Sequence, residues 1–344
     1  MRAMVLRGRD LGIEDVERPV PGAGQVLARV RACGVCGSDL HFARFAEEML
    51  RISRASGAAG WDSTDLDTGI VLGHEFVAEV VESGPGVTGW PPGARVVSVP
   101  VLVGVDGPGG THSIGYSSRF PGAYGEYVLL STPLLLRVPG NVPDRIAATT
   151  EPCAVGLHAV REAQIRAGER AVIMGAGPIG LMTLLWLKHD GVVHVTVSDP
   201  APARRQLASR LGADLVLDPS GLDLSARLSS EAGGAPPVVF ECVGVPGTLQ
   251  QAMDLVERMG RVIVAGVCMT ADQITPLTGT RKQLTLTFVL AYTAAEFAEA
   301  LAAIGSGAID PSPLVTRAVS LDQLPAAFQS LADPADCKVV LEFA

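Results

Sequence analysis

The chain has 344 residues, and its 36 acidic and 27 basic side chains give a formal net charge of −9. This acidic balance argues against nucleic acid or an anionic membrane surface as the main partner. Hydrophobic residues make up 48% of the chain and charged residues 18%, which excludes a disordered protein and allows about two domains with large cores. The six cysteines are irregularly spaced, so they favour a reducing compartment over a disulfide framework, and we expect a cytoplasmic protein.

Neither a secretory leader nor a membrane span is expected. Charged Arg7 and Arg9 follow the first residues at once, with no apolar stretch and no cleavage site. The longest uncharged run, residues 171–187, is slightly shorter than a membrane span, and Pro178 and several glycines divide it. This run therefore predicts a short strand followed by a helix.

The first part of the chain, to about residue 147, carries short alternating runs bounded by Gly or Pro, which predict a small β-rich domain. Strands are expected at residues 26–32, 76–82 and 94–99. Residues 42–70 combine a helical pattern with a polar stretch. The glycine-rich residues 104–125 are expected to form a long loop.

From about residue 148, apolar strands alternate with helical segments, which predicts a parallel sheet covered by helices on both faces. Strands are expected at residues 171–174, 194–197, 215–217, 238–242 and 262–265. Helices are expected between them at residues 179–189, 201–211, 222–231 and 248–259. Two amphipathic helices, residues 294–304 and 321–331, and a last strand at residues 338–343 follow.

A glycine-rich turn follows the first of these strands: Gly175-Ala-Gly177-Pro178-Ile179-Gly180. Gly175 allows the tight turn, Gly177 lets the backbone approach a pyrophosphate, and Gly180 permits close packing of helix on strand. The phosphates of a dinucleotide would lie at the N-terminus of the following helix. The segment therefore predicts a Rossmann-type nucleotide site.

An acidic residue bears on the choice of dinucleotide. Asp199 ends the next strand 19 residues after Gly180, where the acid that binds the adenosine ribose belongs. Its carboxylate would accept hydrogen bonds from the ribose hydroxyls and repel a 2′-phosphate, so NAD is favoured over NADP. Arg204 and Arg205 leave NADP as an alternative, because an arginine here can bind that phosphate or merely flank the adenine.

A second set of motifs carries metal-ligating side chains. The segment from Cys33 to His41 reads Cys-Gly-Val-Cys-Gly-Ser-Asp-Leu-His, and Gly73-His74-Glu75 and Glu151-Pro152 follow. A thiolate, an imidazole and a carboxylate are suitable ligands for a catalytic zinc ion. Cys33 and Cys36 could be half of a four-cysteine structural site, but the chain has no second Cys-x-x-Cys.

These motifs resemble those of the zinc-dependent medium-chain alcohol dehydrogenases, most of all the sorbitol and butanediol dehydrogenase branch. The motifs are Cys-Gly-x-Cys-Gly-Ser-Asp-x-His, Gly-His-Glu, Glu-Pro-x-x-Val-x-x-His-Ala and Gly-x-Gly-Pro-Ile-Gly, in the family's order over nearly the whole chain. The resemblance implies an α/β fold. A GroES-like, β-rich catalytic domain would cover residues 1–150 and 290–344, and a Rossmann doubly wound parallel sheet would cover residues 151–289.

The resemblance also implies the metal ligands. Cys36, His74 and Glu75 are expected to bind the catalytic zinc. Glu151 resembles a carboxylate that binds the metal directly in some members and through water in others. Whether Glu75 or Glu151 is the third protein ligand stays open.

Further roles come from the same resemblance. Ser38 and His41 would relay the proton of the alcohol, through the cofactor ribose, to solvent. Ala265, Gly266 and Val267, after the fifth strand, would contact the cofactor. The implied reaction is an NAD-linked hydride transfer between a secondary alcohol (or diol) and its ketone, with zinc acting as a Lewis acid.

The chain departs from the family in the segment where many members bind a structural zinc through four cysteines. Residues 101–125 contain no cysteine and carry glycines, Asp106, His112, Ser117 and Ser118 instead. We therefore expect one catalytic zinc per chain and no structural zinc.

A second departure is the spacing between two expected ligands. His74 follows Cys36 by 38 residues, which is longer than in sorbitol dehydrogenases and closer to the butanediol type. Residues 42–69 are expected to form part of a substrate lid, with a surface excursion as the alternative.

Two substitutions bear on the substrate pocket, for which Phe42, Ala291 and Tyr292 are candidates. Sorbitol-type members have a tyrosine where this chain has Phe42, and Phe-Arg-Tyr where it has Leu290-Ala291-Tyr292. The missing hydroxyl and guanidinium would serve a polyol, so we expect a more apolar secondary alcohol or ketone. A polyol dehydrogenase of the sorbitol type is the alternative.

Other classes of function are disfavoured. A zinc-free quinone or enoyl reductase of the same fold would lack Cys36, His74 and Glu75. A non-catalytic dinucleotide-binding protein would not need Ser38 and His41. By resemblance, residues 285–290 form a strand that pairs across a dimer axis, which implies a homodimer or homotetramer.

Overall fold

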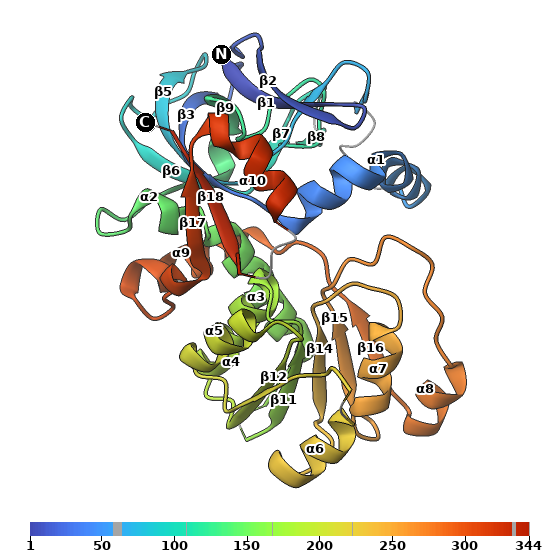
Figure 1. Ribbon diagram of the computed structural model, residues 1–344. Helices are drawn as coiled ribbons and strands as arrows, with labels where there is room; N and C mark the ends of the chain where they lie inside the picture. Colours follow the sequence, from blue (N-terminus) through green and yellow to red (C-terminus); the bar gives the residue numbers. More distant parts are fainter. Residues whose placement is uncertain (58–63, 108, 167, 222, 332–334, 344) are drawn as a thin grey trace. The chain divides into compact units, whose positions relative to one another are not determined.

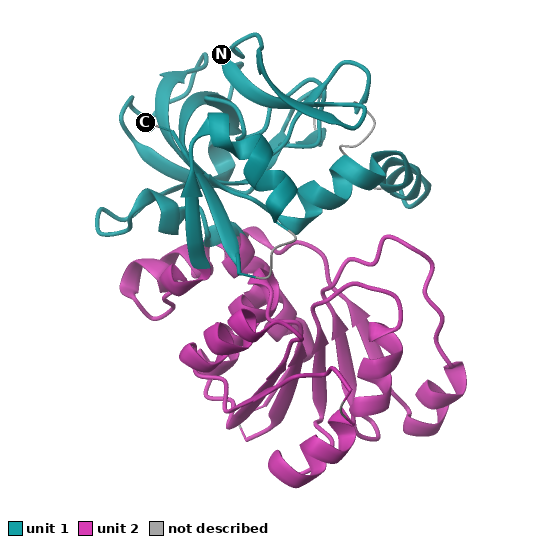
Figure 2. Ribbon diagram, in the orientation of Figure 1, with its two compact units in different colours: residues 1–151, 315–344 teal, residues 152–314 magenta. Residues whose placement is uncertain are grey.

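The computed structural model describes residues 1–57, 64–107, 109–166, 168–221, 223–331 and 335–343 (Figure 1). They form two compact units, Met1–Glu151 with Val315–Ala344, and Pro152–Leu314 (Figure 2). The second boundary differs from the expected one, because residues 290–314 belong to the second unit. Helix α9 (Ala294–Ser306) is tied to helix α3 (Thr150–Ala163) by a hydrogen bond between Glu296 and His158 and an ion pair between Glu299 and Arg161.

The first unit is built on a sheet with the strand order β10-β6-β5-β3-β18-β17, and β9 also pairs with β3. These strands are β3 (Gln25–Gly34), β5 (Glu75–Ser83), β6 (Arg95–Ser98), β9 (Tyr127–Ser131), β10 (Leu135–Arg137), β17 (Val315–Val319) and β18 (Lys338–Glu342). Pairing of β18 with β3 brings the last strand of the chain beside the segment that carries the cysteine motif.

Shorter elements complete this unit. A three-stranded sheet has the order β2-β1-β4, and β7 and β8 form a hairpin. The strands are β1 (Arg2–Arg7), β2 (Asp10–Asp15), β4 (Ile70–Val71), β7 (Val101–Val103) and β8 (Thr111–Ser113), and the α-helices are α1 (Gly37–Ala55), α2 (Asp144–Ala147) and α10 (Leu324–Ser330). Short 3-10 turns lie at Thr132–Leu134 and Leu321–Gln323.

The second unit contains a six-stranded parallel sheet with the order β13-β12-β11-β14-β15-β16. Its strands are β11 (Arg170–Met174), β12 (His194–Ser198), β13 (Leu215–Leu217), β14 (Val238–Glu241), β15 (Arg261–Val264) and β16 (Thr285–Phe288). Its remaining helices are α4 (Pro178–His189), α5 (Pro202–Arg210), α6 (Leu224–Glu231), α7 (Thr248–Leu255) and α8 (Pro276–Lys282), and a 3-10 turn lies at Ser312–Leu314. The strand order reverses beside β11, where such sheets bind nucleotides.

Several elements differ from the sequence-based expectation. Helix α7 ends at Leu255 rather than at residue 259, because Val256 adopts an extended conformation. Strand β16 is a sixth parallel strand of the sheet, next to β15. The expected glycine-rich loop, residues 104–125, contains strand β8, which forms a hairpin with the preceding β7.

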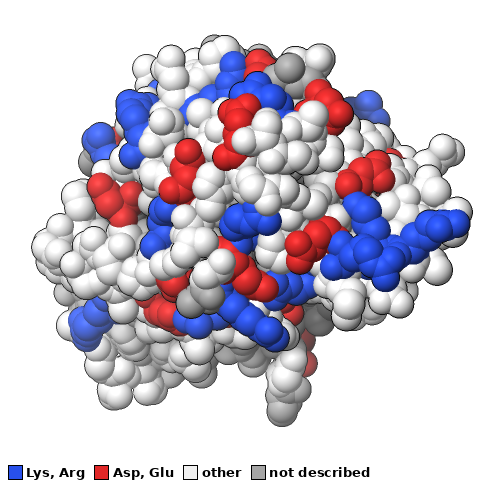
Figure 3. All heavy atoms as spheres, turned by 90° about the horizontal axis from the view of Figure 1, so that it is seen from below, with Lys and Arg blue, Asp and Glu red and all other residues white. Residues whose placement is uncertain are grey.

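Two observations concern the partners that the composition argued against, nucleic acid and membranes. On the face drawn in Figure 3, acidic and basic side chains are intermixed, with one group of basic side chains toward its right edge, so the face is not uniformly basic. Among the described helices, none combines the length and the apolar character that a membrane crossing requires.

Candidate metal centre and cofactor site

Three of the expected metal ligands come together in the first unit. Cys36 follows β3 and is the N-cap of α1, whereas His74 immediately precedes β5 and Glu75 begins it. Antiparallel pairing places Gly34 opposite Glu75, so the two segments meet. One ligand atom from each of Cys36, His74 and Glu75 lies within 4.8 Å of the other two, and His74 and Glu75 are buried.

A buried carboxylate lies behind the histidine. Oδ1 of Asp39 is 3.3 Å from Nδ1 of His74, without the alignment of a hydrogen bond, and leaves Nε2 as the nitrogen for a metal. Asp39 also accepts hydrogen bonds from the hydroxyls of Tyr124 (2.6 Å) and Tyr116 (3.2 Å). Burial is the largest single effect and lowers the pKa of His74, but the Asp39 carboxylate and Cys36 together raise that pKa well above its ordinary value. A carboxylate in this position orients a metal-binding imidazole and increases its basicity.

Glu75 has its own buried partner. Nζ of Lys338 donates hydrogen bonds to Oε1 (2.7 Å) and Oε2 (2.8 Å) of Glu75 and to the carbonyl of Val35 (3.1 Å). Burial is the largest single effect and disfavours the charged amine, but the Glu75 carboxylate and nearby Cys36 together raise the pKa of Lys338. Gly34 provides space for this pair, because a Cβ there would collide with the Glu75 carboxylate.

The donor set fits zinc. One sulfur, one imidazole nitrogen and one carboxylate are the ligand types of catalytic zinc sites, which keep a further position open. Among the described residues, this is the one group of three such side chains close enough to hold a metal ion. Glu151, in the first turn of α3, is buried but is not part of the group.

The expected relay residues lie on α1. Oγ of Ser38 is 3.1 Å from Sγ of Cys36 and 2.8 Å from the hydroxyl of Tyr116. His41 lies one turn further along α1 and is partly buried. Burial, together with the nearby charge of Arg44, lowers the pKa of His41, so its imidazole is neutral near pH 7.

The placement of Phe42 corrects an expectation. Phe42 is fully buried in the core of the first unit, and its ring packs on that of Tyr116 with 5.1 Å between centroids. A side chain without exposed surface cannot contact a substrate directly, so Phe42 supports Tyr116 rather than lining a pocket. The other two candidates lie in the second unit, where Ala291 is exposed and Tyr292 stacks on Phe297 at 5.5 Å.

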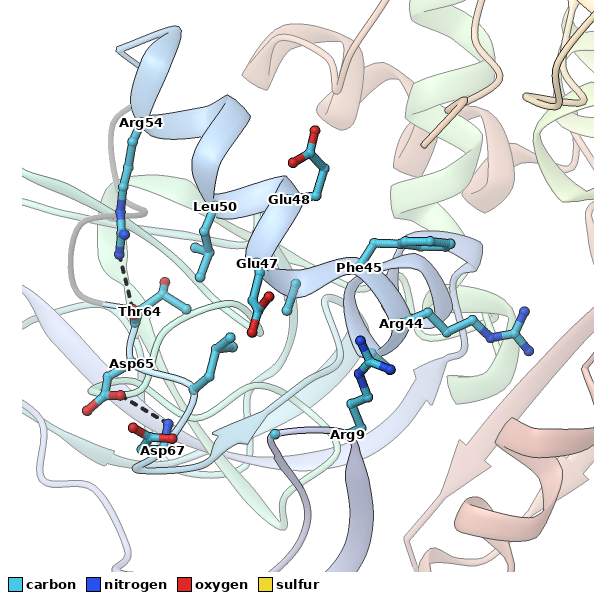
Figure 4. Close-up of a pocket in the computed structure, with 14 residues that line it drawn as sticks. Arg9, Arg44, Phe45, Glu47, Glu48, Leu50, Arg54, Thr64, Asp65 and Asp67 are labelled. Carbon is cyan, nitrogen blue, oxygen red and sulfur yellow. Dashed lines mark hydrogen bonds between the residues drawn. The ribbon is translucent and has the colours of Figure 1, made fainter. Parts of the chain in front are cut away.

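The segment expected to form a lid begins with the long helix α1, which is kinked at Phe45. Residues 58–63 lie outside the described residues. A pocket of about 720 Å³ lies between α1 and residues 64–67 (Figure 4). Arg9, Arg44, Glu47 and Asp65 are among its lining residues, and Cys36, His74 and Glu75 are not.

The nucleotide motif of the second unit has the local geometry that was expected. Gly175 has a φ of +94°, and a Cβ on Gly180 would collide with the carbonyl of Gly175. Gly177 is the N-cap of α4 and faces open space, so its backbone is accessible to a phosphate. Pro178 and Ile179 form the first turn of the helix.

Asp199 lies next to this turn, at the end of β12. Its Oδ2 accepts a hydrogen bond from the backbone of Ala176 (2.8 Å), and its Oδ1 accepts one from Ala201 (2.8 Å). The guanidinium of Arg205 is engaged by the carbonyls of Asp199 and Pro200 and by the carboxylate of Asp218. Arg204 is partly buried, and its Nε has no hydrogen-bond partner.

A second acidic residue, Glu241, binds backbone groups at the carboxyl ends of β14 and β15. Oε1 of the buried Glu241 accepts hydrogen bonds from the backbone of Val243 and Gly244, and its carbonyl accepts from Ala265 and Gly266. Glu241 therefore fixes the segment of residues 265–267 that is expected to contact the cofactor. A pocket of about 560 Å³ lies in this unit and is bordered by Gly175, Ser198 and Val243.

Several of these residues were not singled out from the sequence: Asp39, Tyr116, Tyr124, Glu241 and Lys338. Two carried a detectable signal, since Glu241 ends and Lys338 begins a run of buried apolar strand residues, which is typical of a charge with a fixed partner. The two tyrosines carried none, because they lie in irregular segments.

Comparison with known proteins agrees with this geometry. The family described as alcohol dehydrogenase GroES-like domain matches residues 22–140, and the family described as zinc-binding dehydrogenase matches residues 178–306. The chain is similar to (R,R)-butanediol dehydrogenase of Bacillus subtilis, with 32% identity over 92% of this chain and 91% of that protein. It is also similar to sorbitol dehydrogenase of Halalkalibacterium halodurans, with 27% identity over 99% of each chain.

Solved structures of dehydrogenases are also similar to this chain. The crystal structure of 2R,3R-butanediol dehydrogenase from Bacillus subtilis matches with a TM-score of 0.85 and 30% identity, over 100% of this chain and 99% of that one. A zinc-binding dehydrogenase from Sinorhizobium meliloti, solved bound to NADP, matches with a TM-score of 0.86 and 28% identity, over 99% of each chain. The protein is therefore an oxidoreductase that uses zinc and a nicotinamide cofactor, and it belongs to the zinc-dependent medium-chain alcohol dehydrogenase family.

Proposed function

We propose that Cys36, His74 and Glu75 hold one zinc ion and that the turn from Gly175 to Gly180 holds NAD, for the oxidation of a secondary alcohol or diol to its ketone and for the reverse reaction. The observation that carries this proposal is the buried group of three different ligand types within 4.8 Å of one another. A structural role alone would not require a thiol, an imidazole and a carboxylate at one point.

The bound groups would supply Lewis acidity toward the alcohol oxygen and a hydride acceptor. The chain's own residues supply the proton path. Oγ of Ser38 lies 3.1 Å from the sulfur of Cys36, a proposed ligand, so Ser38 would receive the proton of the substrate hydroxyl and pass a proton on toward His41. His41, neutral near pH 7, can accept a proton and release it to solvent.

NAD is proposed over NADP because Asp199 is held in place by two backbone hydrogen bonds and Arg205 is already engaged. Each carboxylate oxygen keeps a lone pair for a ribose hydroxyl, and its charge repels a 2′-phosphate. The relative bound to NADP makes a direct test necessary. We expect kcat/KM to be higher with NAD than with NADP in the wild type, and Asp199→Ala to reduce or reverse that preference.

The substrate class is tested on a panel that separates apolar diols from polyols. The relatives include a butanediol dehydrogenase and a sorbitol dehydrogenase, and this chain has Leu290-Ala291-Tyr292 in place of the segment whose guanidinium the resemblance assigns to polyol binding. We expect a higher kcat/KM for 2,3-butanediol and simple secondary alcohols than for sorbitol. The opposite order would favour the polyol alternative.

We further propose that the protein is a cytoplasmic homo-oligomer. All six cysteines are free thiols, as expected in a reducing compartment. At the edge of the parallel sheet, β16 leaves Phe288 69% exposed, and Leu290 beyond it is 85% exposed, which is typical of a surface covered by a second subunit.

A further inference from the structure

Tyr116 connects two parts of the metal centre. Its hydroxyl oxygen lies 2.8 Å from Oγ of Ser38 and 3.2 Å from Oδ1 of Asp39. Its ring packs against those of His74 (5.4 Å between centroids) and Phe42 (5.1 Å), and the whole side chain is nearly buried. Tyr116 is thus fixed by its ring, so that its hydroxyl has a defined place.

The directions of these hydrogen bonds follow from the available hydrogens. The carboxylate of Asp39 is surrounded by donors: the hydroxyls of Tyr124 and Tyr116 and the backbone N–H of Cys36 (3.4 Å). Because a carboxylate is a stronger acceptor than a hydroxyl, Tyr116 donates its hydrogen to Asp39. The oxygen of Tyr116 is then left as an acceptor, and Ser38 is the donor to it.

Ser38 therefore has one hydroxyl hydrogen and two acceptors within reach. These are the oxygen of Tyr116 at 2.8 Å and the sulfur of Cys36 at 3.1 Å. If the oxygen of Tyr116 were removed, the hydrogen would turn to the sulfur, where it would reduce the negative charge that the thiolate offers to a metal.

We propose that Tyr116 is a positioning residue for the proton relay: its oxygen directs the Ser38 hydroxyl away from the sulfur of Cys36 and fixes it, through Asp39, relative to His74. The inference rests on the proposed function, in which Ser38 Oγ receives the substrate proton. With its hydrogen directed to Tyr116 at rest, Ser38 Oγ keeps lone pairs free to accept that proton, and it then passes one proton on along the relay toward the neutral imidazole of His41, so that the serine hydroxyl is restored.

The first test compares Tyr116 with Tyr124. Both hydroxyls donate to Asp39, but Tyr116 also contacts Ser38. Tyr116→Phe keeps the ring and removes the hydroxyl, and loss of one orienting hydrogen bond is expected to lower kcat about tenfold, with KM changed less than about twofold. Tyr124→Phe is the matched control, because it removes a hydroxyl from the same carboxylate at the shorter distance of 2.6 Å without touching Ser38. The proposal requires Tyr116→Phe to have the larger effect at equal zinc content. An equal or larger loss in Tyr124→Phe would overturn it.

The second test asks whether Tyr116 acts through Ser38. In a double-mutant cycle, Tyr116→Phe should have no further effect on kcat in the Ser38→Ala background. Equal losses in both backgrounds would show that Tyr116 acts elsewhere.

A spectroscopic measurement gives a readout that does not depend on turnover. In the cobalt-substituted protein, Tyr116→Phe should shift the thiolate-to-metal charge-transfer band to shorter wavelength, because the Ser38 hydrogen then stabilises the sulfur lone pairs. The shift should disappear when Ser38 is also replaced by Ala, and an unshifted band in Tyr116→Phe would overturn the proposal. If Ser38→Ala alone leaves kcat unchanged, the relay of the proposed function fails, while this spectrum still tests the orientation of Ser38.

Discussion

Glu75 and Lys338 lie side by side without exposure to solvent, and Nζ of the lysine contacts both carboxylate oxygens. A single unpaired charge at this depth would cost several kcal/mol, so each residue makes the other tolerable. In the same way, the negative charge of Asp39 stabilises positive charge on the His74 imidazole. The proposed metal ligands Glu75 and His74 are therefore held by partners that do not themselves belong to the ligand group.

At the residue scale, the first prediction concerns the pH dependence of the relay. Burial and the charge of Arg44 lower the pKa of His41, and loss of that charge stabilises the imidazolium. Arg44→Gln should therefore raise the pKa of His41 and move the acidic limb of the kcat profile for alcohol oxidation to higher pH. Arg44→Lys keeps the charge and should leave the limb in place. A limb that stays or moves to lower pH in Arg44→Gln would rule out His41 as the titrating group.

At the element scale, the β7–β8 hairpin shows how this chain stabilises residues 101–125, the segment that contains no cysteine. The carboxylate of Asp106 pairs with Arg119 (2.6 Å) and with His112 (3.0 Å). Phe120 packs edge-on against His112 and beneath the guanidinium of Arg119. The described part of this segment is thus held by an ion pair, a hydrogen bond and one aromatic ring.

Asp106→Asn tests this account of the hairpin. Asp106 has a φ of +63°, which Asn tolerates, so the substitution removes the charge with little backbone strain. Arg119 holds the pKa of Asp106 below its ordinary value, so the ion pair stabilises the fold above about pH 4 and this contribution is lost as pH falls further. We expect a small decrease in Tm at pH 7 that disappears at low pH and is reduced by salt, as measured by thermal unfolding. A decrease that is the same at low pH would mean that the charge is not responsible.

The elements of the second unit were predictable within one or two residues for most strands, because strands buried on both faces leave apolar runs such as residues 238–240. Helix α7 was predicted too long, because the helical sequence pattern continues past Val256 whereas the backbone becomes extended at that residue. The site was predictable only where its residues share a motif. Tyr116 is 78 positions from Ser38, and Lys338 is 263 positions from Glu75, so only the folded sheet brings these pairs together.

At the scale of the whole molecule, β16 is the element through which we expect two chains to associate. Phe288→Asp should yield a smaller species than the wild type in light scattering coupled to gel filtration, because it places a charge in the apolar interface. Val20→Asp is the control, since Val20 is 77% exposed in the other unit. A wild-type monomer, or an unchanged mass for Phe288→Asp, would refute association through this edge.

The most direct test of the metal centre is the zinc content per chain, measured by elemental analysis on purified and dialysed protein. The account predicts a value near one in the wild type and a value near zero in Cys36→Ser. Cys268→Ser, which removes an exposed thiol outside the ligand group, should keep the wild-type value. A value near two in the wild type would contradict the absence of a structural zinc. Full activity without zinc, or retention of zinc by Cys36→Ser, would contradict the assignment of the metal to Cys36, His74 and Glu75.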